Sequence, residues 1–217
     1  MGPKTLKFKV GLYLAIALTV VMVAFIVLVA RQHRTHLLDA AISHVTQLSE
    51  VVTKSTRFAM LQNQPSYVHR IIEDVGSQEG IVKIRIMSKD GTIIHSSFPD
   101  EFGLQVDKKA EACFHCHESE TPLAQIPRHK RARIFESSNG SRLLGSMEVI
   151  RNEPSCSNAS CHVHSKEQSV LGVLDIVYSL DEIDRKAWRD TLTIAGFAIG
   201  FVIIASLFVS FFVHRMV

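Results

Sequence analysis

Residues 81–97 read IVKIRIMSKDGTIIHSS, and this stretch decides the fold of the chain. Its first half alternates between two sets of side chains, Val82, Ile84 and Ile86 on one side and Lys83, Arg85 and Met87 on the other. A period of two residues is typical of a half-buried β-strand. Lys89-Asp90-Gly91 then predicts a tight turn, so residues 92–97 should return as a second, antiparallel strand.

Three further strands are predicted later in the chain. Residues 131–135 and 142–150 flank Asn139-Gly140, a pair that favours a hairpin turn. Residues 169–178 form another run rich in β-branched and aliphatic side chains. The sequence therefore predicts an α+β fold built on a five-stranded antiparallel sheet.

Long helices are expected on both sides of this sheet. Before it, apolar residues recur at steps of three and four, at Leu38, Ile42, Val45, Leu48 and Val52. This spacing marks a helical stripe, and no Gly or Pro interrupts residues 31–63, so one long helix is expected there. The stripe could pack on its own domain or form the seam of a parallel homodimer, and a homodimer is the expected assembly.

Two more helices are predicted from local signals. Pro65 opens a short helix that ends before Gly76, and Ser179-Leu-Asp-Glu182 has the form of a capping box that starts a third helix. The acids at this end of the chain are interpreted as ordinary strand-end and helix-start residues: Asp175, Asp181, Glu182 and Asp184. No catalytic residue is predicted, because no acid–base pair or nucleophile stands out, and enzymatic activity stays uncertain.

Two stretches are long and apolar enough to cross a membrane. Hydrophobic residues make up 47% of the chain, and residues 10–30 and 191–213 contain no charged side chain. Each exceeds the roughly 20 residues that a spanning helix needs. A cleaved secretion signal is the alternative for the first stretch, but its apolar region is longer than such signals have. We therefore expect two transmembrane helices.

Two cysteine motifs carry the chemistry of this sequence. The first is Cys113-Phe-His-Cys116-His117, and the second is Cys156-Ser-Asn-Ala-Ser-Cys161-His162. A Cys-x-x-Cys-His run is typical of covalent c-type haem attachment, in which two thiols bind one porphyrin and the adjacent His ligates the iron. The second motif has a wider spacing between its cysteines but keeps the Cys-His junction. Two haem c groups are therefore predicted.

Two alternatives remain open for the same cysteines. Four Cys could close one tetrahedral zinc site, or form two disulfides outside the cytosol. Neither alternative requires a His directly after the second Cys of each motif. The haem interpretation does, and the sequence has that His in both motifs.

The haem interpretation assigns ligand roles to specific residues. Thioether bonds are expected at Cys113, Cys116, Cys156 and Cys161, with His117 and His162 as proximal iron ligands. For the distal positions we consider His164 first and His129 second, followed by His95, His69 and Met147. A vacant sixth position, suited to a small gas, is also possible.

Haem attachment also predicts on which side of the membrane residues 31–190 lie, which the distribution of charged residues does not. Lysines precede the first span, but arginines and lysines also flank the loop between the spans, so the positive-inside count is ambiguous. Maturation of c-type haem takes place outside the bacterial cytoplasm. We therefore expect residues 31–190 in the periplasm, residues 1–9 and 214–217 in the cytoplasm, and the bacterial inner membrane as the location.

The chain resembles a known family in two stretches, KIRIMSKDGTIIHSS and NEPSCSNASCHVHSKEQSVLGVLD. Together with the order of helices and strands, these are similar to the periplasmic input regions of dihaem bacterial sensor histidine kinases, which have Cache (PAS-like) domains. The resemblance implies a Cache/PAS-like sheet between two transmembrane helices. In that family a HAMP linker and a kinase core follow the second span, and neither lies within these 217 residues.

Two functions are compatible with these features. The first is a sensor that detects redox state or a small ligand and signals across the membrane, as the input part of a sensor histidine kinase. The alternative is a membrane-anchored dihaem cytochrome that transfers electrons between the quinone pool and periplasmic partners. Nucleic acid is not an expected partner, because the net charge is only +3 and no basic run with interleaved aromatics occurs.

Overall fold

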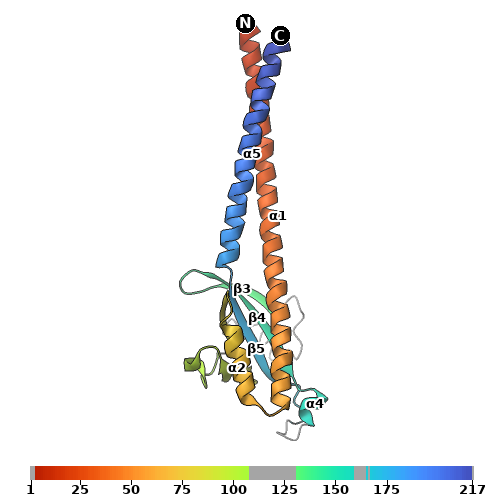
Figure 1. The fold of residues 1–217 in the computed structure, drawn as a ribbon, viewed down its shortest axis with the longest axis vertical. Helices are drawn as coiled ribbons and strands as arrows, with labels where there is room; N and C mark the ends of the chain where they lie inside the picture. The colour runs from red at the N-terminus through yellow and green to blue at the C-terminus, as the bar shows by residue number, and fades with distance from the viewer. Residues whose placement is uncertain (1–2, 108–130, 159–164, 166, 217) are drawn as a thin grey trace. The chain divides into compact units, whose positions relative to one another are not determined.

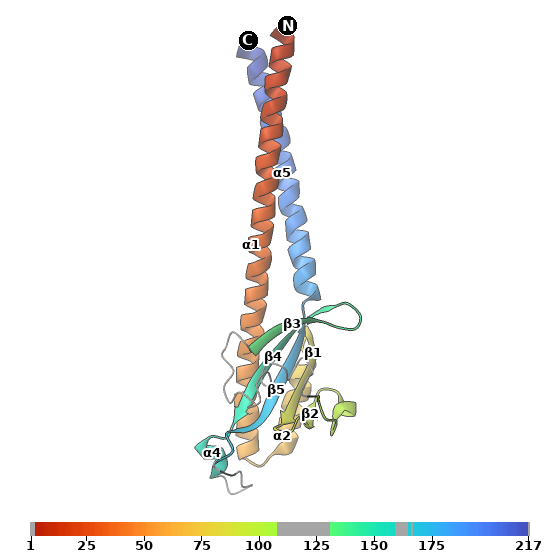
Figure 2. The same ribbon diagram turned by 180° about the vertical axis from the view of Figure 1, so that it is seen from behind.

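The computed structural model describes residues 3–107, 131–158, 165 and 167–216. The chain divides into two compact units. One unit combines Met1–Asp39 with Ile183–Val217, and the other is Ala40–Glu182. Figures 1 and 2 show the elements of both units from opposite sides.

The first unit pairs the apolar ends of two long helices. Helix α1 runs without a break over Pro3–Leu61, and helix α5 over Asp181–Met216. Both are long and apolar enough to cross a membrane by length and composition, and no other helix in the described ranges is. Within this unit His33 Nε2 lies 2.8 Å from Asp190 Oδ2, and Arg34 lies 3.6 Å from Asp184. These pairs join α1 to α5 beside the apolar stretches; the predicted limits of the spans stay predictions.

The second unit is an α+β domain, and its five-stranded antiparallel sheet confirms the predicted fold class. The strands follow the order β2-β1-β5-β4-β3. Their bounds are β1 Ile81–Ser88, β2 Ile93–Ser96, β3 Ala132–Glu136, β4 Arg142–Arg151 and β5 Val170–Ser179. The predicted turn between β1 and β2 is present, and Gly91 adopts φ 87° there, a conformation that favours glycine.

Local signals define where the helices of this unit begin and end. Asn63 adopts a left-handed φ of 52°, and its N–H donates to Met60 O, which ends α1. Pro65 then occupies the first turn of α2 (Pro65–Gly76), where its missing N–H costs nothing. At the other end, Ser179 Oγ accepts a hydrogen bond of 3.2 Å from the N–H of Asp181, two residues later. A capping box would use the N–H of Glu182, so Ser179 stands at the start of α5 as expected but with a different bond.

Helices α1 and α2 cover the same face of the sheet (Figures 1 and 2). Val45 and Val52 of α1 are buried, and Ser49 Oγ donates a hydrogen bond of 3.1 Å to Ser146 Oγ on β4. Val68 and Ile72 bury the matching side of α2. The apolar stripe of α1 therefore packs at least partly on its own domain, as one of the two interpretations predicted.

The opposite face of the sheet is also buried, which the sequence did not indicate. Met87 was expected on a polar side of β1 but is 3% exposed, next to Val173 in the register of β1 and β5. Met147 and Val149 form a buried cluster on this face with Val170 and Val173. The prediction of a half-buried strand at residues 81–88 is therefore wrong for this part of β1, because side chains on both faces are removed from water.

A cluster of buried charged side chains lies on this same face of the sheet. Asp175, in the middle of β5, is fully buried, and its Oδ2 lies 3.0 Å from both Nε and Nη2 of Arg85 on β1. Its Oδ1 accepts a hydrogen bond of 2.8 Å from Arg133 Nη2 on β3. Gly145 makes room for that guanidinium, since a Cβ there would lie 2.4 Å from Arg133 Cζ. The interpretation of Asp175 as an ordinary strand-end acid is therefore wrong.

We expect Asp175→Asn to destabilise the domain by about 3–5 kcal/mol, because it leaves two buried guanidinium groups without their shared carboxylate. Urea unfolding of the detergent-solubilised chain measures this. Asp100→Asn, at an exposed position, is the matched control and should stay within about 0.5 kcal/mol of the wild type. Equal stability of the two variants would contradict the structural role of the cluster.

Candidate functional site

The predicted haem-attachment residues fall mainly outside the described part of the chain. Cys113, Cys116 and His117 lie outside it, and so do the remaining predicted ligands: His129, Cys161, His162 and His164. Cys156 is described. The structure therefore bears on the second motif through its first cysteine, and the other assignments stay predictions.

Cys156 is held in a short helix at the end of the sheet. Strand β4 ends at Arg151, and Pro154 starts the one-turn helix α4 (Pro154–Ser157). The N–H of Cys156 donates to Glu153 O at 2.8 Å, which closes this turn. The Cys156 side chain is 6% exposed.

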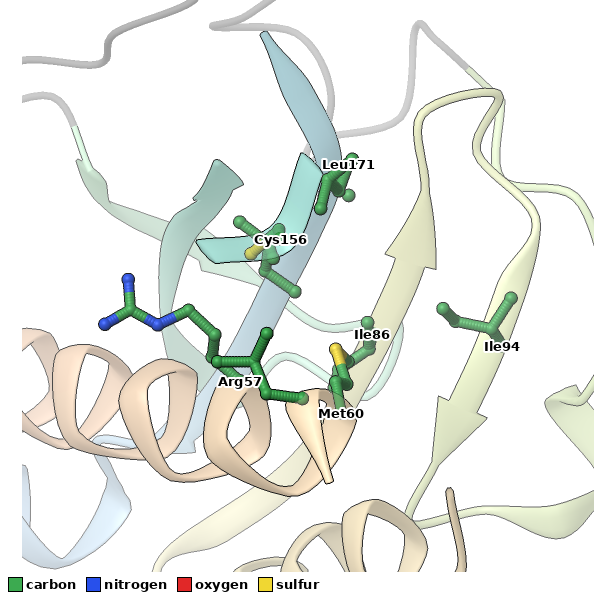
Figure 3. A pocket seen from close by; sticks show the side chains of 9 residues that line it. Arg57, Met60, Ile86, Ile94, Cys156 and Leu171 are labelled. Carbon is green, nitrogen blue, oxygen red and sulfur yellow. The ribbon is translucent and has the colours of Figure 1, made fainter. Parts of the chain in front are cut away.

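The Cys156 side chain lines an apolar pocket of about 120 Å³ (Figure 3). Helix α1 supplies one wall, and strands β1, β2, β4 and β5 supply the others. The apolar lining residues are Met60, Leu61, Ile86, Ile94, Ile150 and Leu171. Five elements far apart in the sequence thus converge on one thiol, which periodicity alone does not reveal.

This pocket fits part of the predicted cofactor. Its walls are mostly apolar, as the vinyl-bearing edge of a porphyrin would require, and a Cys thiol is the group that forms a thioether with a vinyl substituent. Its volume lies below the roughly 300–1,000 Å³ of pockets that enclose a drug-sized ligand. The described residues can therefore hold one edge of a macrocycle, not a whole one. Zinc and disulfide alternatives depend on Cys161 and the first motif, which lie outside the described residues.

Asn152 closes the loop that carries the second motif. Its Nδ2 donates to Ser165 O at 2.9 Å and to Gln168 O at 2.8 Å, and its N–H donates to Ser169 O at 3.0 Å. One side chain therefore ties the start of the loop to its end. The sequence contained no signal for this role beyond the frequent use of Asn in turns.

A charged groove of about 280 Å³ adjoins the apolar pocket. Arg57 and Ile150 line both hollows. In the groove, Arg57 forms an ion pair with Glu153, and Arg131 Nη1 lies 2.5 Å from Glu148 and 3.3 Å from Glu50. The site thus combines an apolar part around a thiol with a polar part rich in charge.

The lower-ranked distal candidates lie elsewhere in the domain. Met147 is 1% exposed in the buried cluster on the face opposite the helices, so it is a core side chain. His95 on β2 and His69 on α2 face each other with ring centroids 6.3 Å apart. Burial, and then the charge of His69, lower the pKa of His95 below its ordinary value. His69 also lies 3.2 Å from Glu73.

A solved structure with a similar fold was found. The sensor domain of the histidine kinase DctB from V. cholerae matches with a TM-score of 0.50 and 12% identity, over 78% of this chain and 60% of that chain. The chain therefore shares the fold of that solved domain. The Cache-like fold class predicted from the sequence is thereby confirmed, while the match spans less than two thirds of the solved protein.

A second match is weaker. An extracellular ligand binding receptor from Desulfohalobium retbaense gives a TM-score of 0.31 and 12% identity, over 63% of this chain and 24% of that chain. No family model matches the sequence, and no curated protein does.

We expect Asn152→Ala to loosen the second-motif loop. Two side-chain hydrogen bonds are lost, which together should weaken local closure by about 1–3 kcal/mol. Hydrogen exchange at the Gln168 amide, which donates to Ser165 O, should accelerate accordingly. Asn158→Ala, an exposed Asn on the same loop, is the control. Unchanged exchange in Asn152→Ala would show that other contacts close the loop.

Stability should also depend on His95 at mildly acidic pH. Because its pKa is lowered in the folded state, the unfolded chain binds the proton more readily as the pH falls below about 6.5. The free energy of unfolding should therefore decrease through that range, until the pH falls below the folded-state pKa. Urea titrations at several pH values should show a flatter profile for His95→Gln than for the wild type. His44→Gln, at an exposed position of α1, should leave the profile unchanged.

Proposed function

We propose that this chain is the membrane-anchored, extracytoplasmic input domain of a signalling receptor, and that its sensory cofactor is haem c attached at two motifs. Three features support this function: the sensor-domain fold, two helices able to span a membrane, and the paired cysteine motifs. The observation that carries it is the burial of Cys156 on an apolar pocket lined by α1. The main domain, residues 31–190, would lie in the periplasm of a bacterium.

In this proposal the two motifs hold one haem each. Cys113 and Cys116 would bind the first, and Cys156 and Cys161 the second, with His117 and His162 as proximal ligands. His164 and His129 remain the candidates for the distal positions. The bound haem would supply an iron that changes charge on reduction or exchanges a distal ligand. The protein's part is to hold the porphyrin edge in a dry pocket and to respond to that change.

The walls of the apolar pocket suggest how the response would leave the domain. Met60 and Leu61 belong to α1, the helix that contains the first apolar segment without interruption. Leu171 belongs to β5, which is followed directly by α5 and the second apolar segment. A change at the pocket would therefore act on the two elements that continue into the membrane helices. Such a local event is read elsewhere when it biases a two-state element.

A homodimer and a cytoplasmic kinase module complete this proposal. A homodimer would place two copies of α1 side by side, and Val51 and Phe58 of α1, which are 60% and 67% exposed, are apolar side chains available for that contact. A cytoplasmic kinase module would receive the signal. Electron transfer between the quinone pool and periplasmic partners remains the alternative function, and it requires no such coupling to α1 and β5.

Haem content tests the cofactor directly. The chain expressed with c-type maturation should carry two covalent haems, and Cys113→Ala/Cys116→Ala and Cys156→Ala/Cys161→Ala should each retain one. Reduced-minus-oxidised spectra and denaturing gels stained for haem measure this. Colourless protein after export, or zinc bound by the cysteines, would overturn the proposal. Fusion to a kinase module then separates the functions, since an output that ignores both haem oxidation state and added small haem ligands would favour the electron carrier.

A further inference from the structure

The charged groove beside the Cys156 pocket contains more cations than carboxylates. Its basic residues are Lys54, Arg57, Arg131 and Arg151, and its acidic residues are Glu50, Glu148 and Glu153. Over the whole groove, one positive charge is therefore in excess. An anionic group that enters the groove would find a favourable potential, which is strongest where water is partly excluded.

The contacts within the groove show which cations are available. Arg57 pairs with Glu153, while Arg131 contacts both Glu50 and Glu148. Within the described ranges, Lys54 and Arg151 contact no carboxylate, and both are exposed at the groove. The groove thus holds three ion pairs, made by two arginines with three glutamates, and two cations without a carboxylate partner among the described residues.

We infer that this groove binds the carboxylate groups of the haem that is attached at Cys156, with Lys54 and Arg151 as their cationic partners. The inference rests on the proposed function. A porphyrin of this type has vinyl substituents on one edge and two propionate carboxylates on another, so it needs an apolar site and a basic site close together. The Cys156 pocket and the groove are two such sites, and Arg57 and Ile150 line both.

Arg57 is placed to keep the two parts of the site together. In Figure 3 its stem borders the apolar pocket while its guanidinium points away from Cys156. That guanidinium forms the ion pair with Glu153, which precedes α4 and caps its start. Arg57 is therefore a positioning residue that fixes the segment before Cys156 against α1, and its charge is already neutralised.

The location of Lys54 gives the inference a consequence for signalling. Lys54 and Arg57 lie one turn apart on α1, so this helix would contact the cofactor both through apolar walls and through charge. A cation near the iron stabilises the ferrous form, since reduction removes one positive charge. Lys54 and Arg151 would therefore set the reduction potential of this haem and couple it to the position of α1.

Redox titration of the holoprotein tests the inference. Lys54→Gln and Arg151→Gln should each lower the midpoint potential of one of the two haems, because a stabilising positive charge is removed. At fixed potential the ferric-to-ferrous ratio should rise about twofold to tenfold per charge, because both cations are exposed and water screens part of their effect. The potential of that haem should also become more dependent on pH, since its propionates lose the cations that keep them ionised. Arg70→Gln, an exposed cation on α2 outside the groove, is the control and should change neither property.

Haem stoichiometry, measured first, separates the possible failures. Two covalent haems with unchanged potentials and pH dependence in both groove variants would overturn the inference and leave the proposed function standing. If Lys54→Gln and Arg151→Gln shift the midpoint potential only as much as Arg70→Gln does, the inference is also wrong, because the shift then reflects only the change in net charge. Absence of covalent haem from the wild type would overturn the proposed function and the inference with it. The Cys113→Ala/Cys116→Ala variant, which should retain the Cys156 haem alone, assigns the shifted potential to the correct site.

Discussion

Helix α1 is held on the sheet by a strip of small and β-branched side chains. Val45, Ser49, Val52 and Thr56 turn toward the strands and are almost completely buried, and the Ser49–Ser146 hydrogen bond fixes the helix to β4. Burial of such a strip stabilises the contact chiefly through the hydrophobic effect, while the Ser49–Ser146 pair restricts the register of α1 on β4. The apolar pocket depends on this contact, because Met60 and Leu61 reach it only while α1 stays in place.

The sequence predicted the architecture well because the architecture follows from local periodicity. The alternation in residues 81–88, the Gly91 turn and the stripe at steps of three and four each correspond to an observed element. Features that depend on distant partners were not predictable. Asp175 could not be distinguished from a surface acid, because Arg85 and Arg133, which neutralise it, lie on strands distant in sequence. Met87 likewise has as its neighbour in the sheet Val173 of β5, a residue distant in sequence.

The candidate site likewise has features that the sequence predicts and features that depend on distant residues. The motif identified Cys156 as a chemically important residue, but its apolar surroundings come from five separate elements. Arg57 and Asn152, which position the segment around Cys156, carry no motif of their own. The spacing of a sequence motif identifies the reactive side chains. Tertiary packing determines whether their surroundings are apolar or charged, and which helices and strands they contact. The residues of the first motif, Cys113, Cys116 and His117, are assigned from their spacing in the sequence.

The unbroken course of α1 from Pro3 to Leu61 imposes a rule on its length. An α-helix advances about 1.5 Å and turns roughly 100° with each residue. Inserting one residue between Ser49 and Val52 would therefore turn Val45 and Ser49 by more than a quarter turn away from the sheet while Val52 and Thr56 stay on it. Insertions of seven residues would nearly restore the phase, with an error of about 20°. Substitutions at the exposed positions of this segment should thus be tolerated far more readily than changes in residue number, and an insertion that keeps both parts of the strip on one side of the helix needs about seven or eleven residues.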